Sequence, residues 1–307
     1  MLPAARNKKM THHVSVLLKE SIDYLSVKSD GRYADVTFGA GGHSLMIAKQ
    51  LTTGHVYGFD QDEDSVNGFE GHPNITVIRS NFRFLRNFLR YYDALPVDGI
   101  LADLGISSHH IETPERGFSF RFDAPLDMRM NTASEFNAQQ IIAEYSTEEI
   151  TRVLRNYGEV DQAWKIANAI VKARTEKQVE TTFQLVDILS RFARPGRENS
   201  LFAQVFQALR IEVNHEMEAL SEFLKQSYDC LKPGGRLVVI SYHSLEDRMV
   251  KSFLKSQKTN DSFAENIMGR KDLMWKDISR GALTPSEEEL NENPRSRSAK
   301  LRVAEKI

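Results

Sequence analysis

Hydrophobic positions in the first part of the chain follow two alternating periods. Residues 16–25 and 44–51 place apolar side chains at helical spacing. Short apolar runs of the length of buried strands lie at residues 33–36, 55–60, 75–78 and 97–103. Strands that alternate with helices are typical of a parallel sheet covered on both faces. We therefore expect an α/β domain in this part of the chain.

After residue 110 the strand pattern stops and amphipathic helical stripes replace it. The stripes lie at residues 163–171, 185–192 and 201–217. Because no strand pattern interrupts them, we expect a helical domain at 111–215. It would be inserted into a discontinuous α/β domain made of residues 1–110 and 216–307.

The third stripe continues beyond the insert. Its apolar positions run on through Leu220 and Leu224, so the spacing predicts one long helix that returns to the α/β domain. A Leu-Lys-Pro-Gly-Gly sequence at 231–235 is predicted to stop that helix. Residues 237–240, all apolar, then have the pattern of a further buried strand.

Composition excludes several classes of protein. The 307 residues contain 40 Lys and Arg against 42 Asp and Glu, a net charge of -2, so a protein that holds nucleic acid by overall charge is disfavoured. With 41% hydrophobic residues, the chain is globular. The single Cys230 excludes an intramolecular disulfide and a cysteine-cluster metal site, as expected for a cytoplasmic protein. No apolar run approaches the roughly 18 residues of a membrane span, so we expect no membrane partner.

The two ends of the chain differ in character from the middle. Residues 1–9 are basic but lack the apolar stretch of a secretory signal, and Met10 is an alternative start. Near the other end, acidic residues 287–289 precede a basic segment at 293–302. Composition alone leaves open whether this segment is a solvated terminus or binds an acidic partner.

The strongest local signal is the sequence DVTFGAGGHS at 35–44, between a predicted strand and a predicted helix. Its glycines allow a tight turn and close approach of a ligand, and the helix that follows offers unpaired N–H groups. Asp60 ends the second strand, where a carboxylate can accept both hydroxyls of a ribose. Phe82 follows the third strand and can stack on adenine, and Asp103 ends the fourth. This order favours S-adenosylmethionine, with its methionine part at the glycine turn.

Nicotinamide dinucleotide binding is the main chemical alternative, because such sites also place an acid after the second strand. Two features argue against it. Ser44 stands where the dinucleotide fingerprint has its third glycine, and Asp35 precedes the turn, where a pyrophosphate would disfavour an acid. A loop without any ligand remains the structural alternative.

Together these stretches resemble the MraW (RsmH) family of S-adenosylmethionine-dependent cytosine-N4 methyltransferases of small-subunit ribosomal RNA. Besides 35–44, the matching stretches are HVSVLLKE at 13–20, DGILADLGISS at 98–108, RGFSF at 116–120, DAPLDMRM at 123–130, YGE at 157–159, FQALRI at 206–211, ISYHSLEDR at 240–248 and residues 293–302. The resemblance implies a Rossmann-like methyltransferase sheet interrupted by a helical substrate-binding domain. It also implies a target cytidine in the decoding (P-site) region of 16S rRNA and suggests a homodimer.

The resemblance assigns the cofactor contacts residue by residue. They map onto Gly41, Gly42, His43, Asp60, Phe82 and Asp103. His110 stands where the family usually has a glutamine that contributes to cofactor binding. A glutamine amide can donate and accept hydrogen bonds from one end of its side chain. Each imidazole nitrogen of His110 can only donate or only accept.

The acceptor side requires a group that restores nucleophilicity to the cytosine amine. We expect Asp103, or the carbonyl of Leu104, to accept a hydrogen bond from N4. His243, after the fifth strand, would bond the base or a phosphate. Its structural alternative is a helix N-cap at Ser244 with Asp247 at the third helical position.

RNA contacts are expected from local basic patches. Arg116 and Arg129, with Arg121, are interleaved with Phe118, Phe120 and Phe122, which either stack on bases or pack in a core. Arg295 and Arg297, with Lys300 and Arg302, form the second patch. The histidine pairs at 12–13 and 109–110 lack ligand spacing, so we expect no metal. A non-catalytic assembly factor that binds the cofactor without turnover is the remaining alternative.

Overall fold

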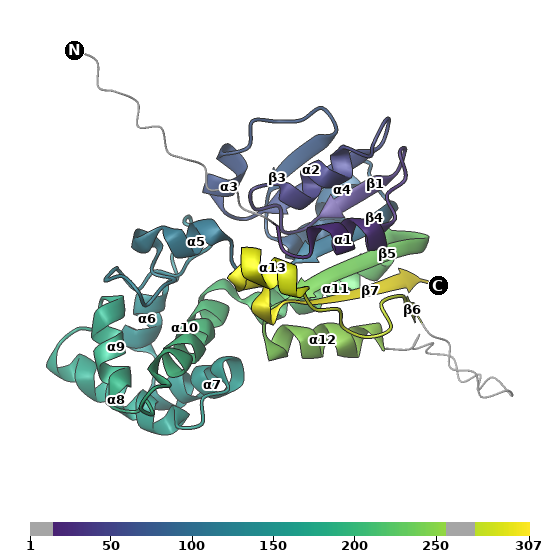
Figure 1. Ribbon diagram of the computed structural model, residues 1–307. Helices are drawn as coiled ribbons and strands as arrows, with labels where there is room; N and C mark the ends of the chain where they lie inside the picture. Colours follow the sequence, from purple (N-terminus) through teal and green to yellow (C-terminus); the bar gives the residue numbers. More distant parts are fainter. Residues whose placement is uncertain (1–14, 256–273) are drawn as a thin grey trace, which may run out of the picture.

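The computed structural model describes residues 15–255 and 274–307 and shows a sheet with its helices beside a separate lobe of helices (Figure 1). The alternative start at Met10, the basic leader and the first histidine pair lie outside the described residues. Within those ranges, every helix is too short or too polar to span a bilayer.

Seven strands form one sheet in the order β3-β2-β1-β4-β5-β7-β6. Their bounds are Arg32–Asp35 (β1), His55–Asp60 (β2), Ile75–Arg79 (β3), Val97–Asp103 (β4), Leu231–Ser241 (β5), Trp275–Asp277 (β6) and Lys300–Lys306 (β7). Strands β1 to β5 pair in parallel, and β7 pairs antiparallel with both β5 and β6. The expected parallel α/β sheet is confirmed, and β6 and β7 extend it.

Helices surround this sheet and form the lobe. The α-helices are α1 (Leu18–Leu25), α2 (Gly42–Ala48), α3 (Glu63–Asn67), α4 (Leu85–Tyr91), α5 (Ser108–Glu112), α6 (Ala138–Glu144), α7 (Thr147–Gly158), α8 (Ala163–Glu176), α9 (Thr182–Ser190), α10 (Glu198–Asn214), α11 (Glu216–Cys230), α12 (Ser244–Leu254) and α13 (Glu287–Glu292). The 3-10 helices are η1 (Phe82–Phe84), η2 (Pro114–Arg116) and η3 (Pro294–Ser298).

Strand side chains alternate between two hydrophobic clusters, one on each face of the sheet. Ala34 and Ile100 pack with Leu89 of α4 and Phe223 of α11. The preceding side chain on β1, Tyr33, points to the opposite face and packs in the other cluster with residues of α1 and α2. Helices on both faces therefore explain why these strands are almost continuously apolar.

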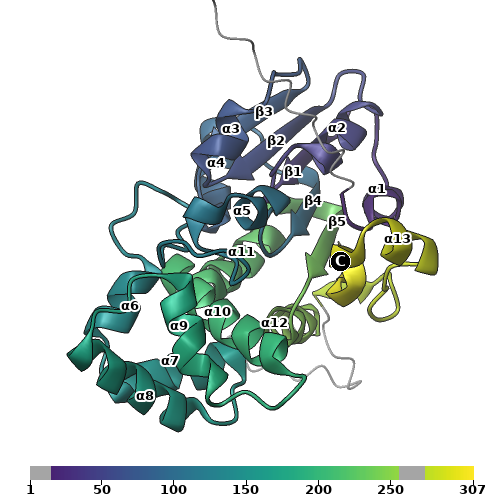
Figure 2. The same ribbon diagram turned by 60° about the vertical axis from the view of Figure 1, so that its left-hand side comes forward.

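The helical lobe has its own core. Helices α6 to α10 pack around a third cluster of buried residues that includes Ile141, Ile166, Leu189 and Leu209 (Figure 2). Capping boxes at Asn137, Ser146 and Thr181 begin three of these helices.

The third hydrophobic stripe is not one helix, as its spacing predicted, but two. His215 adopts left-handed backbone angles, φ 49° and ψ 42°, and separates α10 from α11. The physical reason is that the two helices serve different cores. Leu209 of α10 packs in the lobe, whereas Leu220 of α11 packs beneath the sheet, so the chain must change direction between them.

Two segments near the fifth strand have roles beyond those that the sequence predicted. The Pro-Gly-Gly sequence does not only end a helix. It bulges out of β5, where Leu231 pairs with Val97 and the next register pair joins Arg236 to Gly99. The basic segment near residue 300 is no solvated terminus, because Leu301 and Val303 of β7 are fully buried between β5 and β6.

Candidate functional site

The carboxyl ends of four neighbouring strands place the expected site residues on one rim of the sheet. Asp35 of β1 is opposite Gly58 of β2 and Leu101 of β4. Asp60 and Asp103 therefore each extend two residues beyond Asp35 on either side of it. In open α/β sheets this rim, at the carboxyl ends of the strands, is where ligands bind.

The glycine turn between β1 and α2 is held by close contacts that exclude side chains. Gly41 has φ 80°, and a Cβ there would lie 2.9 Å from the ring of Phe38. A Cβ on Gly42 would lie 2.0 Å from the Oγ of Ser15. Above Gly39, by contrast, the space is open, since a Cβ would meet only a carbonyl oxygen 3.9 Å away. The turn is thus packed from below and open toward the rim, which suits a ligand that approaches the backbone.

Asp60 joins the turn to the second strand. Its Oδ2 accepts a hydrogen bond from the N–H of Gly39 at 2.8 Å, and its Oδ1 accepts one from the N–H of Asp62 at 2.8 Å. Each carboxylate oxygen has a second lone pair, so two acceptor positions remain for ligand hydroxyls. Burial raises the pKa of Asp60, because few water molecules reach the carboxylate. This geometry fits the expected ribose contact.

Phe82 begins η1 after the third strand, close to the end of β2. Its partly buried ring packs edge-on against Phe223, with centroids 5.5 Å apart. The preceding Asn81 fixes this turn, since its side chain accepts from the N–H of Arg83 and donates to Gln61. The Asn81–Gln61 bond and the hydrogen bond from the Ser80 N–H to the Asp60 carbonyl join the start of η1 to the end of β2, so the segment that carries Phe82 begins at the rim.

Asp103 lies at the centre of a hydrogen-bonded group that spans three segments. The hydroxyl of Tyr242, after β5, donates to Asp103 Oδ1 at 2.7 Å. The Nδ1 atom of His43 lies 4.0 Å from Asp103 Oδ2, and its Nε2 atom lies 3.2 Å from the carbonyl oxygen of Val16. The backbone N–H of Asp103 donates to the hydroxyl of Thr37. Asp103 and His43 therefore lie together, as the resemblance implied.

Two carboxyls at this rim, one partly buried and one fully buried, have raised pKa values. Burial raises the pKa of Asp103 to about 6, although His43 and the Tyr242 hydroxyl act in the opposite direction. Burial also raises the pKa of Asp35 to about 6, against the hydrogen bond from the Ser44 hydroxyl. Asp35 is fully buried and binds Ser44 and the N–H of Thr37, so it organises the turn from within.

His110 is part of a buried ion-pair network that sequence reasoning did not foresee. Its Nε2 atom lies 2.5 Å from Asp62 Oδ2, and its ring packs against Phe118 with centroids 4.8 Å apart. Burial acts to raise the pKa of Asp62, but the hydrogen bond from His110 and the charges of His110 and Arg116 outweigh it and hold that pKa at about 2. His110 therefore contacts Asp62, whose N–H donates to Asp60, and does not contact Asp60 itself through a hydrogen bond.

Arg116 completes this network and is not placed as an RNA contact. Its side chain is about nine-tenths buried, and its guanidinium donates to Asp62 and Asp64 and to the carbonyl oxygens of Arg129 and Met130. With its terminal nitrogens engaged in this way, it ties the start of the helical lobe to the segment after β2. The expected phosphate contact at Arg116 is not supported.

We expect Arg116→Ala to lower the free energy of unfolding by about 3–5 kcal/mol, because it leaves the buried Asp62 carboxylate without its guanidinium partner. Urea unfolding at neutral pH measures the loss. Arg295→Ala is the matched control, since Arg295 and Glu112 are both half-exposed and such pairs contribute at most about 1 kcal/mol. Equal, small losses in both variants would contradict the structural role of Arg116.

The other basic residues expected to contact RNA differ in whether they already form ion pairs within the protein. Arg129 donates to Asp127 through two nitrogens, and its third nitrogen donates to two backbone carbonyls of the following loop. Arg302 binds Asp247 in the same bidentate way, and Arg295 contacts Glu112 at 2.9 Å. Arg297 is exposed and makes no side-chain bond within the described ranges.

The phenylalanines of the first patch differ in how far they are exposed to solvent. Phe118 is buried in the core of the helical lobe, and Phe120 packs against Phe202 and Phe206. Phe122 remains 46% exposed. Core packing therefore explains two of the three rings, and only Phe122 offers a face to solvent.

His243 caps α12, one residue earlier than the sequence predicted. Its Nδ1 accepts from the N–H of Glu246, and Glu246 Oε2 accepts from the N–H groups of Tyr242 and His243. The capping box thus uses Glu246 and not Asp247, whose carboxylate instead binds Arg302. The cap fixes the position of Tyr242 and hence of its hydroxyl on Asp103.

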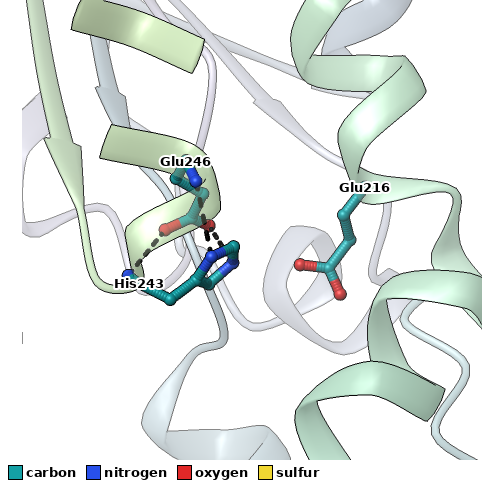
Figure 3. Close-up of side chains that lie close together, drawn as sticks. All are labelled: Glu216, His243 and Glu246. Carbon is teal, nitrogen blue, oxygen red and sulfur yellow. Dashed lines mark hydrogen bonds and ion pairs between the residues drawn. The ribbon is translucent and has the colours of Figure 1, made fainter. Parts of the chain in front are cut away.

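A largely buried group of three ionisable side chains, of which only Glu246 is fully enclosed, adjoins this cap. Figure 3 shows Glu216 of α11 facing the imidazole of His243, with Glu246 on the other side. Their potential ligand atoms lie within 4.8 Å of one another, a spacing near that of a metal site. Both oxygens of Glu216, however, accept from Arg210, at 2.8 and 3.0 Å. A guanidinium at this position opposes a second cation, so we assign the group to ion pairing between the lobe and the rim.

Tyr242 and Asp62 are site residues to which the sequence analysis assigned no role of their own. Tyr242 lay in the quoted stretch at 240–248, and its position directly after a buried strand was the available signal. Asp62 offered none, because its partners His110 and Arg116 are 48 and 54 residues away in the chain.

Comparisons with known proteins agree on one family. The model of the MraW methylase family matches residues 10–307. Relatives named ribosomal RNA small subunit methyltransferase H include one from Bacteroides fragilis (strain YCH46), 49% identical over 98% of this chain and 99% of its own length. The one from Cytophaga hutchinsonii is 49% identical over 96% and 99% of the two chains. The one from Parabacteroides distasonis is 48% identical over 98% and 99%.

Proposed function

Since the chain belongs to the MraW methylase family, we propose that it methylates the exocyclic N4 amine of a cytidine in the decoding (P-site) region of 16S rRNA. Membership makes it an S-adenosylmethionine-dependent methyltransferase whose relatives are named for small-subunit ribosomal RNA. The observation that carries the proposed atom is Asp103, a partly buried acceptor held by Tyr242 on the same rim as Asp60.

The residues at the rim fit S-adenosylmethionine. The open face above Gly39 and the free acceptor positions of Asp60 suit its amino-acid and ribose parts, with Phe82 available for adenine and His43 beside Asp103. When bound, the cofactor supplies an electrophilic methyl group on a sulfonium. The contribution of His110 is indirect, since it braces Asp62 next to Asp60.

Catalysis by these residues is mainly positioning. An in-line displacement needs the amine and the methyl group to be aligned at contact distance. The Asp103 carboxylate accepts a hydrogen bond from N4, which returns electron density to the nitrogen and offsets the positive charge that develops there. Tyr242 holds that carboxylate, and His243 acts as a positioning residue because its cap fixes the Tyr242 backbone.

We further propose that residues 111–215 form an inserted substrate-binding domain, with 1–110 and 216–307 as the methyltransferase domain. One contact that supports a joint site is Glu159, at the end of α7, which accepts from the Ser244 hydroxyl at 2.6 Å and from Arg248 at 2.7 Å. The lobe is thereby fastened to the segment that carries Tyr242 and His243. A homodimer and action in the cytoplasm belong to the same proposal.

The deciding experiment is methyl transfer from labelled S-adenosylmethionine to undermethylated small ribosomal subunits, followed by nuclease digestion and mass spectrometry of the nucleosides. The expected product is N4-methylcytidine. Label on another nucleoside would retain the cofactor and overturn the atom. Cofactor binding with no transfer would favour the assembly-factor alternative.

A further inference from the structure

A pocket of about 290 Å³ opens beside the candidate site, between the segment after β5 and the segment that leads into β7. One wall is formed by residues 242–244. The facing wall is formed by Thr284 and by residues 297–300. The pairing of Ser241 with Lys300 brings these two walls together.

This pocket lies next to Asp103. In the sheet, Ile240 pairs with Asp103 on one side and with Leu301 on the other, so the pocket occupies the same rim one strand further along. Tyr242 belongs to both places, since it lines the pocket and its hydroxyl donates to Asp103. A nucleotide whose base reaches Asp103 therefore has its backbone near the pocket.

The charges and donors of the pocket favour an anion. Its lining contains no Asp or Glu, but it contains Arg297, Lys300 and four hydroxyl side chains. Two of the hydroxyls are already committed, that of Tyr242 to Asp103 and that of Ser244 to Glu159. The exposed hydroxyls of Thr284 and Ser298 remain available to a ligand.

Among the basic residues of this segment, Arg297 is the one without a charged partner in the part of the chain that the structure describes. Lys300 lies 3.5 Å from Asp247, and Arg302 binds the same carboxylate through two nitrogens. Arg295 is paired with Glu112 and does not line the pocket. A guanidinium presents two parallel donors that match the oxygens of a phosphate.

We propose that this pocket binds an RNA phosphate beside the target nucleotide and that Arg297 is its principal ligand. The inference rests on the proposed function for the identity of the RNA, and it separates Arg297 from Arg295, which the sequence placed in one patch. Contacts of this kind fix the register of the chain without reading its bases. The pocket would thus set which nucleotide reaches Asp103.

The test compares Arg297→Ala with Arg295→Ala, which makes the same change of charge two residues away. Affinity for undermethylated small subunits is measured by filter binding at salt concentrations from about 50 to about 200 mM. Binding through phosphate contacts weakens strongly over this range. We expect Arg297→Ala to weaken binding about tenfold at the low-salt end and to reduce the slope of log affinity against log salt by about 1. Arg295→Ala should leave the slope unchanged.

Arg297→Lys keeps the charge but not the paired donors, so it should restore the slope and only part of the affinity. Equilibrium dialysis of S-adenosylmethionine and thermal unfolding should match the unsubstituted protein for every variant. Equal slopes for Arg297→Ala and Arg295→Ala would overturn the proposal. Because binding is measured apart from turnover, a protein that transfers no methyl group but shows the Arg297 effect would refute the proposed function and leave the phosphate site standing.

Discussion

Replacing Asp103 by asparagine is expected to slow methyl transfer to small subunits by about 10²–10⁴-fold, the usual contribution of a positioned acid or base. The amide keeps an oxygen for the Tyr242 hydroxyl, so the local fold is retained. It loses the negative charge that offsets the charge developing on N4. Single-turnover transfer with saturating cofactor measures the effect directly.

Cofactor binding by this variant is the internal control, measured by calorimetry with S-adenosylmethionine. The proposed role requires that binding changes much less than the rate does. If affinity and rate fall by the same factor, Asp103 serves the cofactor and not the amine. Asp229→Asn is a matched variant, because Asp229 is an exposed acid paired with Arg86 just before β5, at the opposite end of the sheet from Asp103.

The dependence of kcat/KM on pH provides a second test of the Asp103 carboxylate. A carboxyl whose pKa burial has raised to about 6 is largely protonated below pH 6 and then lacks the negative charge that offsets the charge developing on N4. We expect kcat/KM to fall as pH decreases through about 6 and the Asp103→Asn variant to lack this limb. Asp35 has a pKa of about 6 as well, so cofactor affinity is measured over the same range. A parallel fall in affinity would assign the limb to Asp35.

Asp60→Ala is expected to reduce the affinity for S-adenosylmethionine about 100-fold, since hydrogen bonds to a charged group contribute about 1.5–3 kcal/mol each. In the proposed site the remaining lone pairs of the carboxylate accept from the ribose, and the carboxylate also holds the N–H of Gly39. Both the ligand contact and the turn are lost together. Calorimetric titration with the cofactor and with S-adenosylhomocysteine measures the change.

Asp60→Asn separates the two roles. Its one carbonyl oxygen can still accept from Gly39 or from a ribose hydroxyl, but not with the charge or the two oxygens of the carboxylate, so an intermediate affinity is expected. An Asp60→Ala variant that binds both ligands as tightly as the unsubstituted protein would remove Asp60 from the site. Hydrogen exchange of the Gly39 amide would then report whether the turn had changed.

The parallel strands could be predicted because each is short, apolar and bounded by turn residues, and their carboxyl ends follow from the parallel order. That order alone put Asp60 and Asp103 on one rim. β7 was missed because Lys300 and Arg302 dominate its composition, while the buried Leu301 and Val303 acquire their role only by pairing with β5. The break at His215 was missed because the apolar stripe continues across it.

The site residues that sequence could not assign are those defined by distant partners. Arg116 was expected at an RNA phosphate, since a basic residue among aromatics has that pattern. It is buried instead because two acids after β2 and two carbonyls of its own loop surround it. His243 differs, because its ring caps α12 through Glu246, only three residues away, close to the helix N-cap that the sequence offered as the alternative.

The outer strand β6 has a consequence for how copies of this protein meet. A free sheet edge invites a strand from another molecule, which leads to aggregation when the edge is long and apolar. β6 has only three residues, and two of them, Lys276 and Asp277, are exposed and charged. Such an edge discourages continuation of the sheet from one copy into the next. The homodimer of the proposal is therefore not expected to continue the sheet across β6.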